Sequence, residues 1–331
     1  MKNIAKKNGH IRSISKRLIV LGYVTVLCTT IILSAFNLGM LVMNLKNRAY
    51  EQTDMLAISY AQSLENVMTR VYDELGIIAT NKEIAQQYVT LDKAALENYL
   101  IGADKKSGKT SEYMFYSISL IDPSGKTYDG YDLSKRSYVQ KALSGQANLS
   151  APVFSAKDKI NTYYAAQKMN NGIADGAVFV GLNIDFFYNV IKGYEESNDY
   201  GGKAFVVNKD GQIVVCSNQD ILSDGVNPIT LVKNGKIEKE NPNGTYNAKD
   251  YEGMAKLVEE MVKGGTDHTK FTYSDGKSYY VSYKPVQGPS GTDDGWSIAV
   301  LVPTKVVTSD FVSALISSIV LVIISVAVVT I

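Results

Sequence analysis

Two long stretches without a charged residue, one near each end, constrain this chain most. The first is residues 18–45, LIVLGYVTVLCTTIILSAFNLGMLVMNL, and the second is residues 311–331, FVSALISSIVLVIISVAVVTI. A helix needs about 20 apolar residues to cross the hydrocarbon core of a bilayer, and both stretches reach that length. We therefore predict a transmembrane helix over 18–45 and another within 309–331, with the residues between them outside the membrane.

Basic residues orient the first predicted span. The segment 1–17 contains no acidic residue and six basic ones, which are Lys2, Lys6, Lys7, Arg12, Lys16 and Arg17. Positively charged flanks stay in the cytoplasm, so this segment is predicted to be a cytoplasmic tail. A cleaved signal peptide is the alternative, but its apolar run is only 7–15 residues long. We expect an uncleaved anchor, a two-pass protein of the bacterial inner (plasma) membrane and an extracytoplasmic middle.

The last residue of the sequence, Ile331, lies inside the second predicted span. We expect the sequence to be a fragment of a longer receptor, whose cytoplasmic output domain would contact cytoplasmic signalling proteins. The alternative is that the output domain belongs to another chain.

Charge and cysteine content exclude some classes of protein. The net charge is +1, whereas a nucleic-acid-binding protein needs a concentrated basic face, so no nucleic-acid partner is expected. Cys28 falls in the first apolar stretch and Cys216 in the middle region, so no disulfide framework is expected. The middle region must therefore depend on its hydrophobic core for stability.

A long helix is predicted to follow the first span. Apolar residues recur every three or four positions, at Leu56, Tyr60, Leu64, Val67, Val71, Leu75 and Ile78. This spacing places one apolar stripe along a helix of roughly 40 residues, or about 60 Å. The stripe would pack on a core, and it would also permit a homodimer through the long helices.

The rest of the middle region alternates with a period of two and contains an internal repeat. SISLIDPSGKTYDGYD, at 117–132, and KAFVVNKDGQIVVCS, at 203–217, both indicate a strand, a turn and a second strand. Further strands are predicted at 148–154, 162–169, 177–183 and in three segments after residue 267, with helices at 138–144, from Asp185, and at 251–263. We predict an α+β fold: the long helix plus two PAS-like antiparallel-sheet modules, 46–199 (membrane-distal) and 200–308 (membrane-proximal), each with helices on one face.

The sequence contains no recognisable motif for catalysis, metal binding or cofactor binding. The two histidines, His10 and His268, have no ligand partners at a recognised spacing. No nucleophile elbow, Walker loop or dinucleotide-binding glycine motif follows a predicted strand. We therefore expect neither an enzyme nor a cofactor.

Binding chemistry is more visible between residues 131 and 145. Tyr131, Arg136 and Tyr138 lie between a predicted strand and a predicted helix. An arginine can hold a carboxylate through two parallel hydrogen bonds, and aromatic rings beside it can form pocket walls. The alternative is an exposed arginine beside ordinary core tyrosines, which the 22 tyrosines of the chain make plausible.

Four motifs in order resemble a double Cache domain, the extracytoplasmic sensor of many bacterial chemoreceptors and of some histidine kinases and diguanylate cyclases. They are Y-D-x-x-x-R-x-Y at 131–138, K-A-L-S-G at 141–145, L-S-x-P-V-x-S at 149–155 and G-L-N-I-D at 181–185. The resemblance covers nearly the whole chain, from the first membrane helix to the second. It implies a ligand in the membrane-distal module.

The resemblance also implies which residues contact that ligand. Arg136 and Tyr138 would hold a carboxylate, and Tyr131 and Tyr163 would line the site. Members that bind amino acids carry acidic residues at the positions of Ser155 and Asn183, so the half that binds an amino group is weakened here. Asp185 completes the set of candidates, and its carboxylate is also expected to cap the helix that follows.

The sequence therefore predicts the ligand-sensing region of a transmembrane chemoreceptor that binds a small carboxylate or amino-acid-like metabolite. Two alternatives stay open at this point. One is the same sensor feeding a histidine kinase or a diguanylate cyclase, and the other is a tethered interaction protein without a small ligand.

Overall fold

The computed structural model describes residues 2–90, 115–155, 160–197, 201–292 and 294–330. The contacts between residues group the chain into two compact units. The first unit combines Met1–Glu51 with Thr304–Ile331, and the second is Gln52–Pro303.

The first unit consists of helical segments with apolar, exposed surfaces. Helix α1 is Lys2–Thr80 and helix α9 is Thr304–Thr330. Among the described residues, the stretch Val20–Thr80 of α1 is the one long and apolar enough to cross a membrane, while the apolar part of α9, Val312–Ile324, is shorter. The predicted N-terminal span is thus supported, and the predicted C-terminal span stays a prediction.

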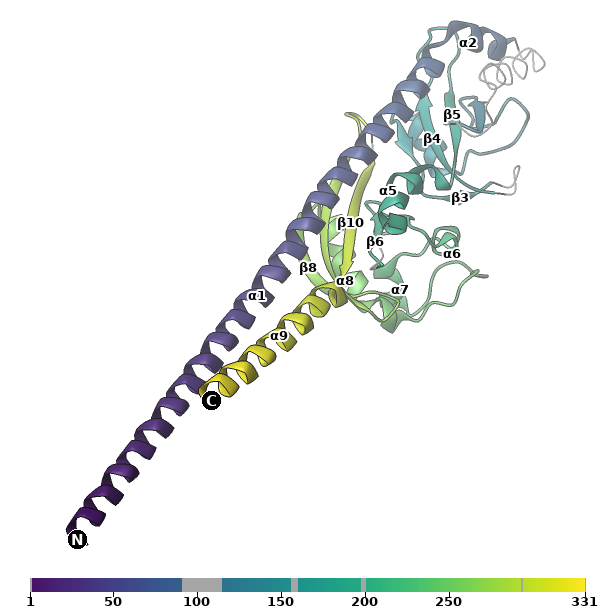
Figure 1. The fold of residues 1–331 in the computed structure, drawn as a ribbon. Coiled ribbons are helices and arrows are strands. Elements are labelled where there is room, and N and C mark those ends of the chain that lie inside the picture. The colour runs from purple at the N-terminus through teal and green to yellow at the C-terminus, as the bar shows by residue number, and fades with distance from the viewer. Residues whose placement is uncertain (1, 91–114, 156–159, 198–200, 293, 331) are drawn as a thin grey trace. The chain divides into compact units, whose positions relative to one another are not determined.

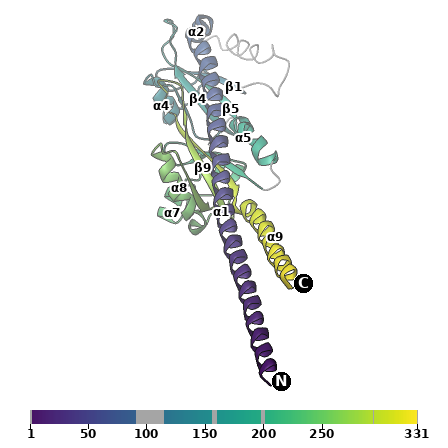
Figure 2. The same ribbon diagram turned by 60° about the vertical axis from the view of Figure 1, so that its left-hand side comes forward.

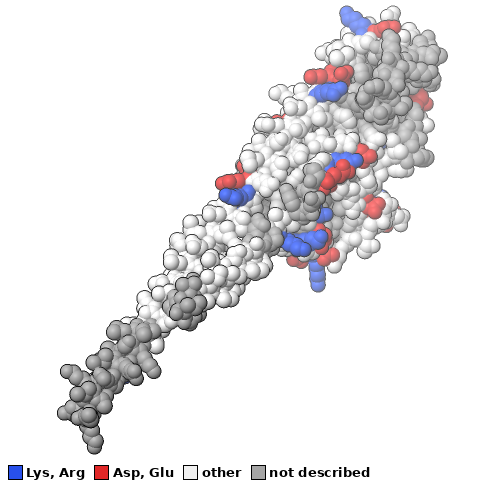
Figure 3. Space-filling model, in the orientation of Figure 1, with Lys and Arg blue, Asp and Glu red and all other residues white. Residues whose placement is uncertain are grey.

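Large apolar side chains in the first-unit part of α1 are exposed. Leu21, Ile32 and Phe36 are each more than 60% exposed. Figure 3 shows no charged atom over the apolar part of the helix on the face in view. Thr25 and Thr30 donate their hydroxyl protons to carbonyls one turn earlier, which keeps polar groups satisfied in a lipid environment.

The first sheet of the second unit is antiparallel. Its strands are β1 (Ser117–Ile121), β2 (Asn148–Leu149), β3 (Val153–Phe154), β4 (Asn161–Lys168) and β5 (Ala177–Asn183). The order is β1-β5-β4-β2, and the short β3 also pairs with β4. The helices of this region are α2 (Lys82–Val89), α4 (Ser137–Leu143) and α5 (Asp185–Ser197).

The second sheet is also antiparallel. Its strands are β6 (Lys203–Val207), β7 (Ile213–Val215), β8 (Asp267–Thr272), β9 (Ser278–Gln287) and β10 (Gly295–Pro303), in the order β7-β6-β10-β9-β8. Its helices are α6 (Gln219–Ser223), α7 (Pro228–Asn234), the 3-10 turn η1 (Ala248–Tyr251) and α8 (Glu252–Val262). The fold class predicted from the sequence, a long helix with two antiparallel sheets, is confirmed.

Within the second unit, α1 packs on one face of both sheets (Figures 1 and 2). One hydrophobic cluster joins Leu64 and Val71 of α1 to Val180 of the first sheet and Ile298 of the second. The opposite face of the first sheet packs on α4, and the opposite face of the second packs on α6, α7 and α8. Strand periodicity explains this separation, because successive side chains point to opposite faces.

The details differ from the sequence-based predictions in three places. The sequence predicted helices on one face of each sheet, whereas both faces are covered, one by α1 and the other by α4 or by α6, α7 and α8. The segment 126–132 forms isolated bridges rather than a second strand. Strand 148–154 is divided into β2 and β3, with Pro152 between them, and a proline cannot donate to a strand ladder. The predicted module boundary at 199–200 lies outside the described residues.

The buried stripe of α1 differs from the predicted one in composition. Leu64, Val71 and Leu75 are fully buried as predicted. The other predicted members, Leu56, Tyr60, Val67 and Ile78, are partly buried beside them. The centre of the stripe also includes small residues and a methionine, namely Ala57, Ala61, Met68 and Ala79. Alanine is only weakly hydrophobic, so the pattern of large apolar residues did not include these positions. The predicted stripe is therefore rotated slightly around the helix relative to the buried one.

Candidate ligand-binding site

An aromatic cluster lies between α4 and the first sheet. Tyr138 of α4 is 4% exposed, and its ring stacks on that of Tyr164 with centroids 5.0 Å apart. Phe179 of β5 meets Tyr164 edge-on with centroids 5.3 Å apart, and its ring is tilted against that of Tyr138 at 5.8 Å. Such offset and edge-to-face pairs are favoured by the ring quadrupoles. The predicted site residue Tyr138 therefore belongs to an aromatic wall on this face of the sheet.

Arg136 directly precedes α4 as its N-cap residue. Its backbone is extended, and its side chain makes no capping hydrogen bond. The side chain is exposed, and within the described part of the chain no hydrogen bond or ion pair engages its guanidinium. Helix N-caps favour Ser, Thr, Asp or Asn, and a positive charge there opposes the helix dipole. Arg136 is thus a poor choice for helix stability at this position.

The positive charge of Arg136 affects the pKa of the Tyr138 hydroxyl. Burial raises the pKa of the Tyr138 hydroxyl above its ordinary value, and the nearby Tyr164 adds to the increase. The positive charge of Arg136 acts in the opposite direction and lowers the pKa. Arg136 is the N-cap of α4 and Tyr138 lies in its first turn, so the exposed guanidinium and the buried ring belong to the same end of this helix.

Tyr131 lies on the loop before α4 and is 53% exposed. Its backbone N–H donates to the Thr127 hydroxyl at 2.9 Å, and its carbonyl accepts from the Thr127 N–H at 2.9 Å. These bonds close the loop 127–131, and Gly130 within it has a positive φ of 93°. The loop thereby holds Tyr131 at the surface.

Ser155 and Asn183 lie at one end of the first sheet. Val153, Thr162 and Asn183 are cross-strand neighbours on β3, β4 and β5. Asn183 therefore has the same parity as Phe179 and shares the α4 face. Ser155 follows β3, is 5% exposed, and donates its N–H to the Ile160 carbonyl at 2.8 Å. The sheet thus brings Asn183 to the face that carries Tyr138, with Ser155 at the same end.

The Asp185 carboxylate does not bond to the backbone amides that it was predicted to cap. The acceptor for its own backbone N–H is the Asn183 side chain, at 3.0 Å. The Asp185 carboxylate instead accepts from the Gln219 amide at 2.7 Å. The prediction that Asp185 caps α5 is therefore wrong, because the asparagine two residues earlier provides the acceptor. Both side chains are exposed.

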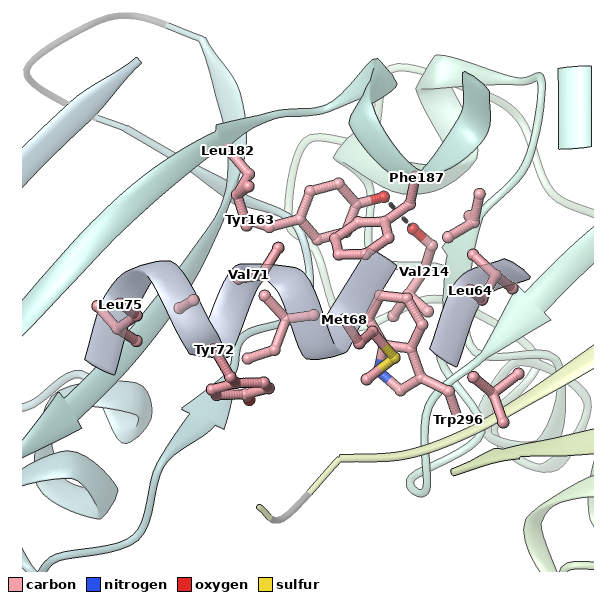
Figure 4. Packing of buried hydrophobic residues seen from close by; sticks show 14 of the residues in the cluster. Leu64, Met68, Val71, Tyr72, Leu75, Tyr163, Leu182, Phe187, Val214 and Trp296 are labelled. Carbon is pink, nitrogen blue, oxygen red and sulfur yellow. Dashed lines mark hydrogen bonds between the residues drawn. The ribbon is translucent and has the colours of Figure 1, made fainter. Parts of the chain in front are cut away.

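Tyr163 lies on the opposite face of the sheet from Tyr138. It is fully buried and packs edge-on against Phe187 at 5.1 Å. Its hydroxyl donates to the Val214 carbonyl of β7, and burial raises its pKa well above the ordinary value. Figure 4 shows Tyr163 and Phe187 beside Met68 and Val71 of α1. The structure therefore does not bring Tyr163 together with the other predicted site residues.

The sequence-based prediction did not include Tyr164 or Phe179, which complete the aromatic wall. The alternation of side chains between the two faces of a strand could have identified Tyr164. Tyr164 is an even number of residues from Thr162 and Ala166, and all three occupy one face of β4, whereas Tyr163 and Ala165 occupy the other. Among the described residues, no group of three or more His, Cys, Asp or Glu side chains could hold a metal ion.

Three solved structures illustrate what the fold is similar to. The periplasmic sensory domain of the Campylobacter jejuni chemoreceptor Tlp1 aligns with a TM-score of 0.53 at 15% identity, covering 80% of this chain and 98% of that one. The ligand-binding domain of the Pseudomonas fluorescens chemoreceptor CtaA, in complex with L-serine, aligns with a TM-score of 0.52 at 19% identity, covering 80% and 99%.

The ligand-binding domain of the Pseudomonas aeruginosa amino acid chemoreceptor PctC, in complex with GABA, aligns with a TM-score of 0.50 at 14% identity, covering 76% and 99%. At these identities the likeness extends to the fold alone. No protein of curated function matches the chain significantly.

The family comparison is independent of these structures. A double Cache family model, described as a Cache domain, matches residues 43–311, which is most of the chain and includes both sheets and the second-unit part of α1. The long helix followed by two antiparallel sheets agrees with that match. The chain is therefore a member of the Cache domain family, of the double Cache type.

Proposed function

We propose that this chain is the extracytoplasmic sensor region of a bacterial transmembrane chemoreceptor, and that it binds a small carboxylate on the α4 face of the first sheet. The observation that carries the proposal is the exposed guanidinium of Arg136 beside the buried ring of Tyr138. An arginine at a helix N-cap costs helix stability and has no compensating contact among the described residues. A carboxylate ligand supplies the missing partner through two parallel hydrogen bonds.

The neutral residues at the other end of the site favour a ligand without an amino group. An ammonium group needs a carboxylate or several strong acceptors when it leaves water. Ser155 has no charge, and the Asn183 side-chain oxygen already accepts from the Asp185 N–H. Short mono- and dicarboxylates therefore suit the site better than α-amino acids.

The relatives support a sensing role of this kind. The CtaA and PctC domains hold L-serine and GABA, two small molecules that each carry a carboxylate. The proposal for this chain keeps the carboxylate and omits the amino group. It also includes two membrane helices, with the second following β10 in the sequence.

Isothermal titration calorimetry on the full chain in lipid nanodiscs tests the ligand class. The panel contains acetate, propionate, lactate, malate and succinate, together with L-serine, L-alanine and GABA. We expect a carboxylate without an amino group to bind, and Arg136→Ala to weaken its binding by at least tenfold. Lys135→Ala is the matched control, since it removes the adjacent exposed cation and should leave the affinity unchanged.

Each result bears on a separate part of the proposal. Binding that survives Arg136→Ala would defeat the assigned site. Tight binding of L-serine or L-alanine, with no response to the plain carboxylates, would defeat the ligand class and leave the site in place. No binding across the panel, with a folded chain, would favour an interaction protein.

The topology has its own test. Alkaline phosphatase or a green fluorescent protein is fused after Ile331 in a bacterial host. Two membrane passes place the fusion point in the cytoplasm, so the fluorescent fusion should be bright and the phosphatase fusion inactive. The reverse pattern would show that α9 does not cross the membrane.

A further inference from the structure

The loop between β9 and β10 of the second sheet reaches the edge of the first sheet. Asp294, just before β10, is 9% exposed, and its Oδ1 accepts the Leu149 backbone N–H of β2 at 2.9 Å. Its Oδ2 accepts the hydroxyl of Tyr72 on α1. One buried carboxylate therefore connects β10, β2 and α1.

Other contacts of the same hairpin reinforce this connection. Thr292 forms a parallel bridge with Ala147, the residue before β2. At the end of β9, the Gln287 N–H donates to the Glu65 carboxylate of α1 at 2.8 Å. Trp296 of β10 packs edge-on against Phe187 of α5 at 4.9 Å.

Strand β2 is in turn connected to the candidate ligand site. Asn148, the other residue of β2, is 2% exposed, and its side-chain amide donates to the Tyr138 carbonyl at 3.1 Å. Tyr138 carries the aromatic ring that stacks on Tyr164. A shift of α4 on ligand binding must therefore either move Asn148 or break its bond to Tyr138.

The chemistry of Asp294 suggests more than packing. Burying a carboxylate is costly unless hydrogen bonds compensate, and an apolar side chain would fill the same space at lower cost. Hydrogen bonds to a carboxylate are stronger than neutral ones and fix the geometry of their donors. A backbone N–H as donor fixes the position of the strand itself, because a backbone donor has no side-chain freedom.

We infer that Asp294 couples the candidate ligand site to β10, so that α4, β2 and the start of β10 change position together. The route runs from Tyr138 through Asn148 and Leu149 to Asp294, and β10 leads at Pro303 directly into α9. Its meaning for signalling depends on the proposed function. The mechanical coupling itself does not depend on any ligand.

Hydrogen exchange on the full chain in lipid nanodiscs, without ligand, tests the coupling. Asp294→Asn keeps the side-chain shape and removes the charge. We expect the Leu149 amide and the amides of α4 to exchange at least tenfold faster, together with those at the start of β10. Amides of β8 and α8, which are remote from this carboxylate, should be unchanged.

Two further variants separate coupling from a general loss of stability. Asp224→Asn is the matched control, because Asp224 is also buried and hydrogen-bonded, to Lys239, Gly244 and Tyr246 in the second sheet region. It should accelerate exchange around 239–246 and not in 137–149. Tyr72→Phe removes the Tyr72 hydroxyl bond to Asp294 and should reproduce the Asp294→Asn pattern more weakly, even if Asp294→Asn folds poorly.

A variant at the ligand-site end of the route tests whether a change there also reaches β10. Asn148→Ala releases the Tyr138 carbonyl, and the coupling predicts faster exchange at Gly295–Ser297 in the otherwise wild-type chain. In the Asp294→Asn background the same change should add less than twofold. Acceleration confined to the β9–β10 hairpin in Asp294→Asn, with α4 and Leu149 unaffected, would overturn the inference. It would leave the proposed function untouched, since no ligand is used.

Discussion

The ring of Tyr138 in α4 stacks on the ring of Tyr164 in β4, with centroids 5.0 Å apart and planes inclined by 23°. Tyr163, the residue beside Tyr164, points to the other face and contacts Phe187 and Trp296 instead. Two adjacent tyrosines of one strand thus belong to different hydrophobic clusters. Substitutions at the two positions should have different consequences for stability and for ligand binding.

The stack itself should contribute to stability. Tyr138→Ala and Tyr164→Ala should each lower the free energy of unfolding by about 3 kcal/mol, since each removes a large buried side chain. The double variant should lose about 1 kcal/mol less than the sum of the two, because aromatic pairs gain about that much beyond their buried area. Urea denaturation of the four proteins measures this coupling. A strictly additive result would mean that the rings are neighbours without a mutual attraction.

Tyr163→Phe should destabilise the chain without affecting the ligand. The substitution leaves the Val214 carbonyl of β7 without this donor, at a cost of about 1–3 kcal/mol. For a domain of this size that corresponds to a decrease in the melting temperature of a few degrees. Calorimetric affinity for the carboxylate found in the panel should stay the same. A tenfold loss of affinity would instead place Tyr163 in the ligand site, as the family resemblance implies.

Arg136→Ser should raise the free energy of unfolding and abolish carboxylate binding. A serine at the N-cap can accept an N–H of the first turn of α4, and the unfavourable charge is removed, so we expect a gain of about 0.5–1 kcal/mol. Carboxylate binding should be lost in the same variant. Lys135→Ser, one residue before the N-cap, should change neither property. A loss of stability in Arg136→Ser would show that the guanidinium has a structural partner.

Asp224 should make the stability of the second sheet region depend on pH. Its side chain is fully buried; burial raises its pKa, but hydrogen bonds from Lys239, Gly244 and Tyr246, with the Asn243 backbone, outweigh this and lower the pKa to about 2. Because the folded-state pKa is below that of the unfolded chain, the stabilisation is present above about pH 4 and is lost as the pH falls towards 2.

The size of this effect can be measured by comparison with Asp224→Asn. The carboxylate should contribute at most about 2.5 kcal/mol at neutral pH. Denaturation between pH 3 and pH 7 should show a steeper decline in acid for the wild-type chain than for the variant. Parallel curves would mean that Asp224 is not stabilised in its charged form.

The sequence predicted the fold well because its periodicities are strong. β5 and α5 begin at the predicted residues, 177 and 185, and the long helix was evident from the spacing of Leu64, Val71 and Leu75. What failed were elements decided by local hydrogen bonds. Asp122 accepts from the N–H groups of Ser124 and Lys126, which closes the turn tightly and leaves no second strand after it.

The candidate site was predictable only in part. Arg136 and Tyr138 stand in a recognisable motif, whereas Tyr164 and Phe179 are contributed by strands whose register had to be known. The bond between Asp294 and Leu149 joins residues 145 positions apart and has no local signature. Contacts of this kind depend on how the two sheets are placed along α1.

The shared helix has a consequence for cooperativity. Because one face of α1 forms a wall of both sheets' cores, neither sheet can lose its packing without exposing apolar surface that the other also uses. The second unit, Gln52–Pro303, should therefore melt in a single transition rather than in two. A chain cut between the sheets would leave half of the stripe on α1 bare and prone to aggregate.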